Sequence, residues 1–164
     1  MGSNSPAEGA ISAPIINKGV LYISCGVPGS GKSTFLKTHK GKDEKIISRD
    51  EIRFSLLKEG EEYFSHEDEV FETFITKITE SINSGFNTYA DATHLNHRGR
   101  AKLTDALLEA GCQPRDVQAI LFDVPIAICF ERNEKRKGTK AYVPRGVIRR
   151  MYNQLEIPVE FSHV

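Results

Sequence analysis

The sequence predicts an α/β fold in which a central parallel sheet of about four to five strands is flanked by helices on both faces. Short β-rich apolar runs alternate with segments of helical periodicity, and a cluster of glycines follows the first of these runs. Strands that alternate with helices of this length form right-handed βαβ units, in which neighbouring strands run parallel. A chain of 164 residues buries one core of this kind, so we expect one domain over residues 18–164.

Residues 1–17 show no periodicity and are rich in small residues and proline, so we expect a flexible tail or the remnant of an expression tag. They lack the basic start and apolar block of a secretory signal, and no apolar run approaches the ~18 residues that a membrane span needs. The three cysteines are too scattered for a disulfide framework or a zinc site. We therefore expect buried free thiols without a disulfide partner, a reducing cytoplasmic compartment and no membrane partner.

The first half of the domain contains three expected strands, at residues 19–25, 45–48 and 87–91. Helices are expected at residues 31–40, from an N-cap at Asp50 to about residue 58, and from an N-cap at Ser65 to a stop at Gly85. The last of these helices is the most strongly marked, because its apolar side chains recur at helical spacing: Phe71, Phe74, Ile75, Ile78 and Ile82.

The second half continues the alternation of helix and strand. A helix between an N-cap at Asn96 and a stop at Gly111 has its expected apolar side chains at Ala101, Leu103, Leu107 and Leu108. A fourth strand is expected at residues 117–123, with Pro125 in the first turn of the next helix. A final helix, which returns the chain to the body of the domain, is predicted by Pro144 and the spacing of Val147, Ile148 and Met151.

The formal net charge is zero, because 22 lysines and arginines balance 22 aspartates and glutamates. Nucleic-acid-binding proteins are usually basic, so this total by itself disfavours such a partner. The charges are nevertheless segregated: residues 59–72 hold seven acidic residues and no lysine or arginine, whereas residues 132–150 hold eight basic residues and one acidic residue. For the acidic stretch we expect a solvated face, with a wall that repels misplaced phosphates as the alternative.

A glycine-rich sequence follows the first strand and leads into the first helix. Residues 26–33, Gly-Val-Pro-Gly-Ser-Gly-Lys-Ser, match the phosphate-loop pattern G-x-x-x-x-G-K-[ST] at every position. The glycines let the backbone curl around an anion, and the helix N-terminus offers unpaired N–H groups. Lys32 is placed to reach the β- and γ-phosphates, and the Ser33 hydroxyl suits Mg²⁺. We expect ATP or another nucleoside triphosphate to be bound by Gly26, Val27, Pro28, Gly29, Ser30, Gly31, Lys32, Ser33 and Thr34.

Charged side chains follow the second and third strands, at the sheet edge where the first strand delivers the phosphate loop. Asp50 can accept the proton of an attacking hydroxyl there, and Arg53, one helical turn later, can grip an anionic acceptor. The alternative for this pair is a capping aspartate with an exposed ion pair. Asp91 ends the third strand and is a candidate Mg²⁺ ligand. In the turn after it, His94 has no recognisable partners for a metal site.

Residues 132–140 form a basic segment that begins on a helix and contains a glycine. Arg132 and Arg136 are four residues apart and therefore share a helix face. Such a segment can close over a bound nucleotide and bring an arginine to the charge that develops during transfer. The alternative is a solvated charged face.

These elements, in this order, resemble the 5′-kinase module of phage-type polynucleotide kinases over about residues 20–155. The phosphate loop is shared by many small kinases. Residues 48–53, Ser-Arg-Asp-Glu-Ile-Arg, are more specific, because they are similar to the Arg-Asp-x-x-Arg element of that family. Residues 132–144 and the apolar positions after them are similar to its lid. The resemblance implies a P-loop kinase fold with a basic helical lid.

The resemblance also implies roles for individual residues. Asp50 would be the general base and Arg53 the ligand of the acceptor phosphate, while Arg132 and Arg136 would contact the donor phosphates. Asp91 and the turn after it match the family in type and place, which makes Thr93 and Asn96 candidate acceptor contacts, although Asn96 is also explained as a helix cap.

This sequence departs from the family pattern in two respects. Lys137 and Tyr142 look like insertions within the lid. The better-known members continue into a phosphatase domain, whereas this sequence ends at Val164, so we expect no 3′-phosphatase activity.

The function that we expect is Mg²⁺-dependent transfer of the γ-phosphate of ATP, or of another nucleoside triphosphate, to the 5′-hydroxyl end of DNA or RNA. The catalytic residues would be Asp50, Lys32 and Arg136. One alternative is a kinase of the same build for a small hydroxyl compound, such as a nucleoside, sugar, UDP-sugar or antibiotic. The other is a non-catalytic nucleotide-binding module.

Overall fold

The computed structural model describes residues 18–161, so the tail expected at residues 1–17 lies outside the described residues. Within residues 18–161, four strands form one parallel sheet in the order β2-β3-β1-β4, which confirms the predicted α/β fold. The elements are β1 (Val20–Cys25), α2 (Lys32–His39), β2 (Glu44–Ser48), α3 (Arg49–Leu56), α4 (Glu67–Asn83), β3 (Asn87–Asp91), α5 (His97–Glu109), β4 (Asp116–Leu121), α6 (Ile126–Glu134), α7 (Arg145–Gln154) and the 3₁₀ helix η2 (Val159–Phe161).

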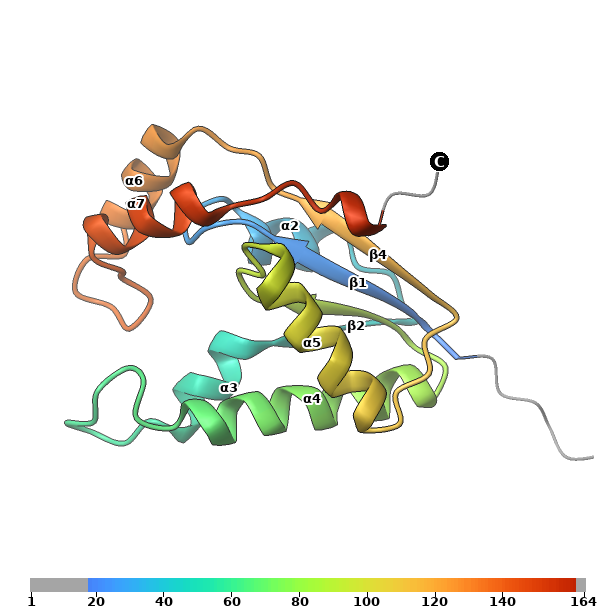
Figure 1. Ribbon diagram of the computed structural model, residues 1–164. Coiled ribbons are helices and arrows are strands. Elements are labelled where there is room, and N and C mark those ends of the chain that lie inside the picture. Colours follow the sequence, from blue (N-terminus) through green and yellow to red (C-terminus); the bar gives the residue numbers. More distant parts are fainter. Residues whose placement is uncertain (1–17, 162–164) are drawn as a thin grey trace, which may run out of the picture.

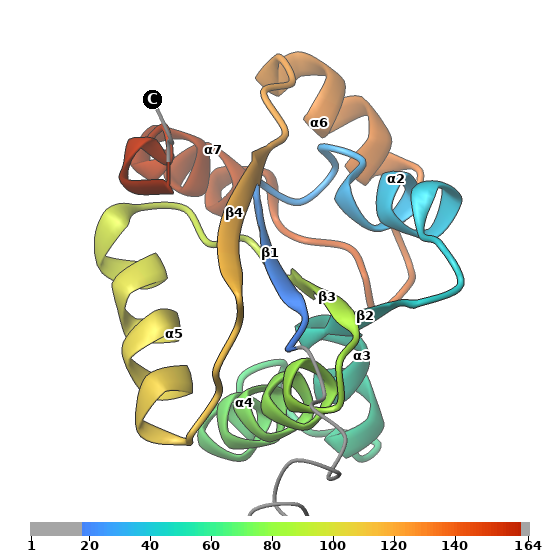
Figure 2. The same ribbon diagram turned by 90° about the vertical axis from the view of Figure 1, so that its right-hand side faces the viewer.

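Helices cover both faces of the sheet (Figure 1). Helices α4 and α5 lie on one side, and α2 and α6 lie on the other (Figure 2). The main core fills the space between the sheet and the α4–α5 layer, with Leu21, Ile23, Phe74, Ile78, Ile82, Leu103 and Leu107 among its members. In the part of the chain that the structure describes, no helix is long and apolar enough to cross a membrane.

A second, smaller cluster joins the glycine-rich loop to the last two long helices. It contains Val27 of the loop, Cys129 and Phe130 of α6, and Ile148 of α7. This packing fixes the loop against the same pair of helices that carries the basic residues. Cys25, Cys112 and Cys129 are all buried, as expected for small apolar side chains, and the structure shows them as free thiols.

Because the sheet is parallel, its strands deliver their carboxyl ends to one edge. Ser48 at the end of β2 is paired with Asp91 at the end of β3, and β1 next to β3 leads directly into the glycine-rich loop. The predicted convergence of these three strand ends is therefore confirmed.

Two predicted helix starts are wrong. Ser48, not Asp50, is the N-cap of α3, and its Oγ accepts a hydrogen bond of 3.2 Å from the backbone N–H of Glu51. A serine followed three residues later by glutamate is a capping-box sequence, so the signal was present. Helix α4 begins after His66, because the Ser65 hydroxyl donates instead to the carbonyl of Glu62 at 2.7 Å.

The later helices agree with the prediction apart from a few positions. Asn96 caps α5 by accepting from the N–H of Gly99 at 2.8 Å, and Leu103 and Leu107 are buried. Ala101 and Leu108, however, lie on the outer face, and Leu108 is 75% exposed. The apolar stripe of α5 is therefore narrower than predicted. Pro125 and Pro144 are the N-caps of α6 and α7, respectively.

Candidate active site

The glycine-rich loop curls between β1 and α2 in the conformation that its sequence predicts. Gly29 and Gly31 have φ values of 85° and 89°, a region that disfavours side chains. A Cβ atom on Gly29 would also lie 2.5 Å from the carbonyl oxygen of Cys129. The loop therefore requires glycine both for its own conformation and for its contact with α6.

Lys32, the first residue of α2, is buried at the centre of this loop. Its Nζ donates to the carbonyl of Val27 at 3.1 Å. Burial lowers the pKa of Lys32, and the carboxylates of Asp91 and Asp50 act in the opposite direction. Thr34, by contrast, is exposed, and its carbonyl accepts a bond from Thr38 within the same helix.

Ser33 and Asp91 meet although they are 58 positions apart in the sequence. The Ser33 hydroxyl donates to Oδ2 of Asp91 at 2.8 Å, at the carboxyl end of β3. Burial raises the pKa of Asp91, which the Ser33 bond and the charge of Lys32 partly offset. A hydroxyl and a carboxylate are the hard oxygen ligands that Mg²⁺ uses together with substrate phosphates and water. The pair fits that ion, and the described residues contain no cluster of three or more histidine, cysteine or acidic side chains that could hold a metal without such help.

Asp50 lies in the first turn of α3, and its side chain is 62% exposed. Arg53, one turn later, is only 6% exposed and forms an ion pair with Oδ1 of Asp50. The Arg53 guanidinium also forms a bidentate pair with Glu67 of α4, with both bonds at 2.8 Å. Its Nη1 donates to the Tyr63 hydroxyl, also at 2.8 Å. The predicted Asp50–Arg53 pair therefore exists, but its arginine is buried rather than exposed.

The charges of this cluster are mutually stabilised. The bonds from Arg53 lower the pKa of Glu67, because they favour its ionised form. Burial opposes the charge of Arg53, but its partners Glu67, Tyr63 and Asp50 outweigh that effect and raise its pKa. Four of the five N–H donors of Arg53 are engaged within the protein.

The turn after β3 forms another wall of the site. Thr93 accepts a backbone bond of 2.9 Å from Gly26 through its carbonyl, which fixes the turn to the start of the phosphate loop. The side-chain oxygen of Asn96 is occupied by the cap of α5. His94 is buried with a φ of 40°, and burial lowers its pKa to about 4. Its Nδ1 bonds the carbonyl of Ser24 at 2.8 Å, and because a carbonyl only accepts, Nδ1 carries the proton.

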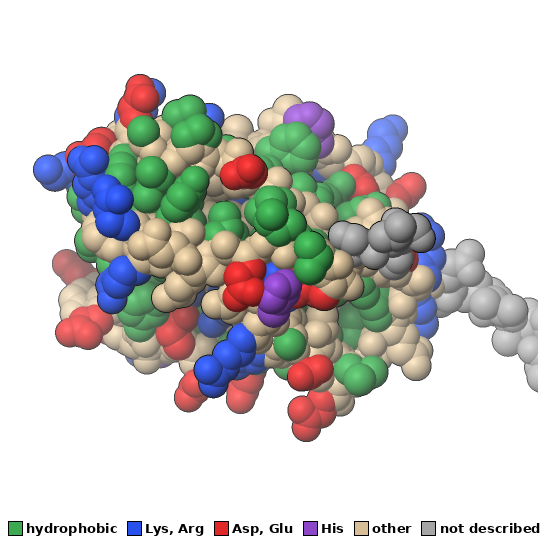
Figure 3. All heavy atoms as spheres, turned by 45° about the horizontal axis from the view of Figure 1, so that its top comes forward, with side chains coloured by type: hydrophobic (Ala, Val, Ile, Leu, Met, Phe, Trp, Pro, Cys, Tyr) green, Lys and Arg blue, Asp and Glu red, His purple; other side chains and the backbone are tan. Residues whose placement is uncertain are grey.

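The basic segment leaves α6 beside the phosphate loop. Arg132 donates to the carbonyl of Gly29 at 3.2 Å, and Arg136 lines the cavity described below. The amide of Asn133 makes two hydrogen bonds to the backbone of Val143, which close the base of the segment between α6 and α7. Lysine and arginine side chains gather at the end of the molecule formed by α6 and α7, at the left edge of Figure 3.

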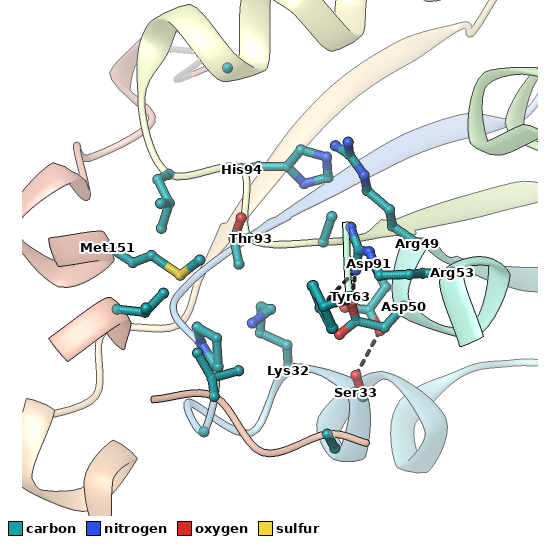
Figure 4. A pocket seen from close by; sticks show the side chains of 18 of the residues that line it. Lys32, Ser33, Arg49, Asp50, Arg53, Tyr63, Asp91, Thr93, His94 and Met151 are labelled. Carbon is teal, nitrogen blue, oxygen red and sulfur yellow. Dashed lines mark hydrogen bonds and ion pairs between the residues drawn. The ribbon is translucent and has the colours of Figure 1, made fainter. Parts of the chain in front are cut away.

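One cavity of about 630 Å³ connects these groups (Figure 4). Its polar lining comes from the phosphate loop and from the ends of β2 and β3. Aromatic and aliphatic side chains complete the lining. The lining includes Lys32, Ser33, Asp50, Arg53, Asp91, Thr93, His94, Asn96 and Arg136, together with Phe54, Tyr63, Phe64, Phe71, Phe74 and Met151. A triphosphate end and a hydroxyl-bearing molecule can therefore share one cavity.

The sequence did not single out Tyr63, Glu67 or Arg49 as residues of this site. Tyr63 and Glu67 come from the acidic stretch and reach the cavity because α4 packs against α3. No motif marks them. The available signal was weaker: residues 59–72 concentrate negative charge directly after the arginines at positions 49 and 53.

This chain is similar to known proteins over most of its length. It is 24% identical over 145 residues to "Transcription factor bHLH140" of Arabidopsis thaliana, which corresponds to 86% of this chain but only 15% of that protein. Among solved structures, it superposes with a TM-score of 0.72 and 22% identity on a chain of the Pnkp1/Rnl/Hen1 RNA repair complex, and the match covers 88% of this chain and 46% of that one.

Two smaller kinases share the fold as well. The match to a sugar kinase from Janibacter sp. has a TM-score of 0.58 with 20% identity and covers 85% of this chain and 79% of that one. The match to a gluconokinase from Sinorhizobium meliloti has a TM-score of 0.57 with 19% identity and covers 88% and 78% of the two chains. The fold is therefore that of a P-loop kinase. The family model described as AAA domain, AAA_33, matches residues 21–158, and the chain belongs to this family.

Proposed function

We propose that this chain transfers the γ-phosphate of a nucleoside triphosphate to the 5′-hydroxyl at the end of a DNA or RNA strand. The observation that carries the proposal is the single cavity in which the Asp50 carboxylate faces the phosphate loop and the Ser33–Asp91 pair. Such an arrangement suits an in-line displacement, in which catalysis consists mainly of positioning and electrostatic stabilisation.

In the proposed reaction, Asp50 orients the acceptor hydroxyl and takes its proton as the oxygen attacks the γ-phosphorus. The bond between that phosphorus and the β–γ bridging oxygen breaks, and the nucleoside diphosphate leaves. Lys32 and Arg136 stabilise the charge on the transferring group, and Arg132 supports the loop at Gly29. Mg²⁺ held by Ser33 and Asp91 would neutralise phosphate charge when bound.

Arg53 and the turn after β3 complete the acceptor side. Since four of the five donors of Arg53 are engaged internally, it offers one remaining Nη2 N–H to an acceptor phosphate, rather than a free bidentate clamp. Thr93 and Asn96 line the same space. The exposed basic residues around α6 and α7 supply the positive surface that a strand end needs. Three buried free thiols support a reducing, cytoplasmic setting.

A kinase for a small hydroxyl compound is the second candidate. The observation in its favour is coverage: this chain spans more than three quarters of the sugar kinase and gluconokinase chains, but less than half of the RNA repair chain. The neutral net charge points the same way. A binding module without catalysis is disfavoured by Asp50, which has no task in such a protein.

One assay separates the three possibilities. The purified chain is incubated with γ-labelled ATP and Mg²⁺ in the presence of 5′-hydroxyl oligonucleotides, of a panel of sugars and nucleosides, or of no acceptor. We expect labelled product with the oligonucleotides. Label on a small alcohol instead would establish the second candidate, and nucleotide binding without any product would establish the third.

A further inference from the structure

Asp50, the proposed general base, is held through one of its two carboxylate oxygens, Oδ1. Oδ1 of Asp50 accepts a hydrogen bond from the Tyr63 hydroxyl at 3.0 Å and forms the ion pair with Arg53. Among the described residues, every hydrogen bond to this carboxylate falls on Oδ1. A carboxylate oxygen with two strong donors is oriented and has few lone pairs left, so Oδ2 is the oxygen that remains for a substrate.

Tyr63 is itself firmly placed. Its ring lies over the Arg53 guanidinium with the Cζ atom 4.5 Å from the ring centroid, and the ring packs edge-on against Phe54 and Phe64. Its hydroxyl accepts from Arg53 and donates to Asp50, so the three groups form a closed triangle of hydrogen bonds. Burial and the negative charge of Asp50 raise the pKa of Tyr63, which keeps the phenol protonated and able to donate.

We propose that Tyr63 is a positioning residue that fixes the Asp50 carboxylate so that its Oδ2 atom receives the proton of the acceptor hydroxyl. This inference rests on the proposed phosphotransfer. The acceptor O–H bond breaks as its oxygen bonds to the γ-phosphorus, the proton passes to Oδ2, and the nucleoside diphosphate leaves. Tyr63 keeps its own proton throughout.

The same geometry gives the acidic stretch a function. Glu67 holds Arg53 through two bonds of 2.8 Å, from Nε and Nη2, whereas Tyr63 accepts from Nη1. Two residues of that stretch thus support the base from α4 and from the segment before it: Tyr63 directly, and Glu67 through Arg53. Other acidic residues of the stretch lie on a solvated face, as expected from the sequence. They include the exposed Glu59, Glu62, Asp68, Glu69 and Glu72.

The test is Tyr63→Phe, which removes the hydroxyl and keeps the ring over Arg53. Tyr89→Phe is the matched control, because the Tyr89 hydroxyl also bonds a carboxylate, that of Glu44 at 3.1 Å, but between strands away from the cavity. Steady-state transfer to the best acceptor is measured for both variants and the wild type. We expect kcat to fall about tenfold in Tyr63→Phe, as a fraction of what a general base supplies, with KM for ATP and acceptor within roughly twofold.

Three results would overturn the inference: an unchanged kcat in Tyr63→Phe, an equal fall in both variants, or a rise in KM with kcat preserved. The last would make Tyr63 a binding residue. Thermal unfolding of each variant shows whether it is folded, and Tyr63→His, which keeps a ring with a donor, should recover part of the loss. A wild type that phosphorylates sugars but not oligonucleotides refutes the proposed acceptor and leaves the comparison of variants valid. A wild type without any transfer refutes both.

Discussion

Two buried arginines organise different parts of this molecule. Arg53 is 6% exposed and Arg100 is 0% exposed, and each makes two hydrogen bonds to a glutamate from another element, Glu67 and Glu160, respectively. The Arg53 cluster also holds Asp50, a carboxylate that is 62% exposed in the cavity. The Arg100 cluster exposes no such group to the cavity. A buried arginine–glutamate pair can thus position a carboxylate in a cavity, as Arg53 does, or join two elements of the fold, as Arg100 does. The difference lies in the other groups that each arginine contacts.

The Arg100 cluster ties the end of the described chain to α5. Besides Glu160 of η2, Arg100 donates to the carbonyl of His94 at 2.9 Å. His97 pairs with Glu156 at 2.9 Å, and the N–H of Glu156 donates to the carbonyl of Leu95 at 2.7 Å. These bonds fix the turn that follows Asp91. The Arg100 guanidinium and its glutamate partner therefore stabilise a wall of the site without lining the cavity.

The largest effect on activity should come from removing Asp50, the exposed carboxylate of the Arg53 cluster. We expect Asp50→Ala to reduce kcat by about 10² to 10⁴-fold, the range of a general base, while ATP binding is kept. Transfer kinetics and nucleotide titration measure the two quantities. A variant that still labels an oligonucleotide at the wild-type rate contradicts the role of Asp50.

Breaking the Arg100 cluster should lower the stability of the protein and leave kcat almost unchanged. Glu160→Ala leaves a fully buried guanidinium without its carboxylate, so we expect a loss of about 3 kcal/mol in the free energy of unfolding. At a temperature where the variant is folded, kcat should remain within roughly twofold of wild type. Urea denaturation and transfer assays on the same sample check this. If kcat collapses while stability is unchanged, the distinction between the two clusters fails.

His94, whose carbonyl Arg100 holds, predicts a pH dependence of stability. The unfolded chain binds the His94 proton near pH 6.5, whereas the native chain binds it only near pH 4. The unfolded state therefore holds more protons in between, and the stabilisation, complete above pH 6.5, is lost as the pH falls towards 4. The loss amounts to about 3 kcal/mol at ~1.4 kcal/mol per pH unit.

His94→Asn is the variant that isolates this effect, because asparagine tolerates positive φ and its amide can still donate to the Ser24 carbonyl. Its unfolding free energy should depend less steeply on pH between 6.5 and 4.5. That window lies above the titration of Glu67 and Glu160, whose pKa values are lowered. Equal slopes for wild type and variant would show that His94 is not the responsible group.

The smallest expected effect is that of salt concentration on the affinity for an oligonucleotide. Both arginine clusters are largely compensated internally, and the positive surface proposed to meet a strand end consists of the exposed basic residues around α6 and α7. We expect a few phosphate contacts and a slope of log K against log salt concentration of roughly −1 to −3. Fluorescence anisotropy with a labelled 5′-hydroxyl oligonucleotide measures it. A much steeper slope would indicate an extended nucleic-acid interface.

The sequence predicts the parts of this site that depend on strand ends. The phosphate loop has a complete motif, and the parallel topology brings Ser33 to Asp91 and Asp50 to the same edge. Tyr63 and Glu67 could not be predicted, because their position depends on the packing of α4 against α3. The N-cap of α3 was missed although Ser48 and Glu51 form a capping-box sequence, so the sequence analysis assigned Asp50 a capping role that Ser48 fills.

The most direct test of the account maps the transferred phosphate. Wild type, Asp50→Ala and Glu160→Ala are each given γ-labelled ATP and an oligonucleotide blocked at its 5′ end, at its 3′ end, or at neither. The account predicts label only where the 5′-hydroxyl is free, with wild type and Glu160→Ala active and Asp50→Ala slower by about 10²-fold or more. Label on a 5′-blocked strand, or undiminished labelling by Asp50→Ala, would contradict it.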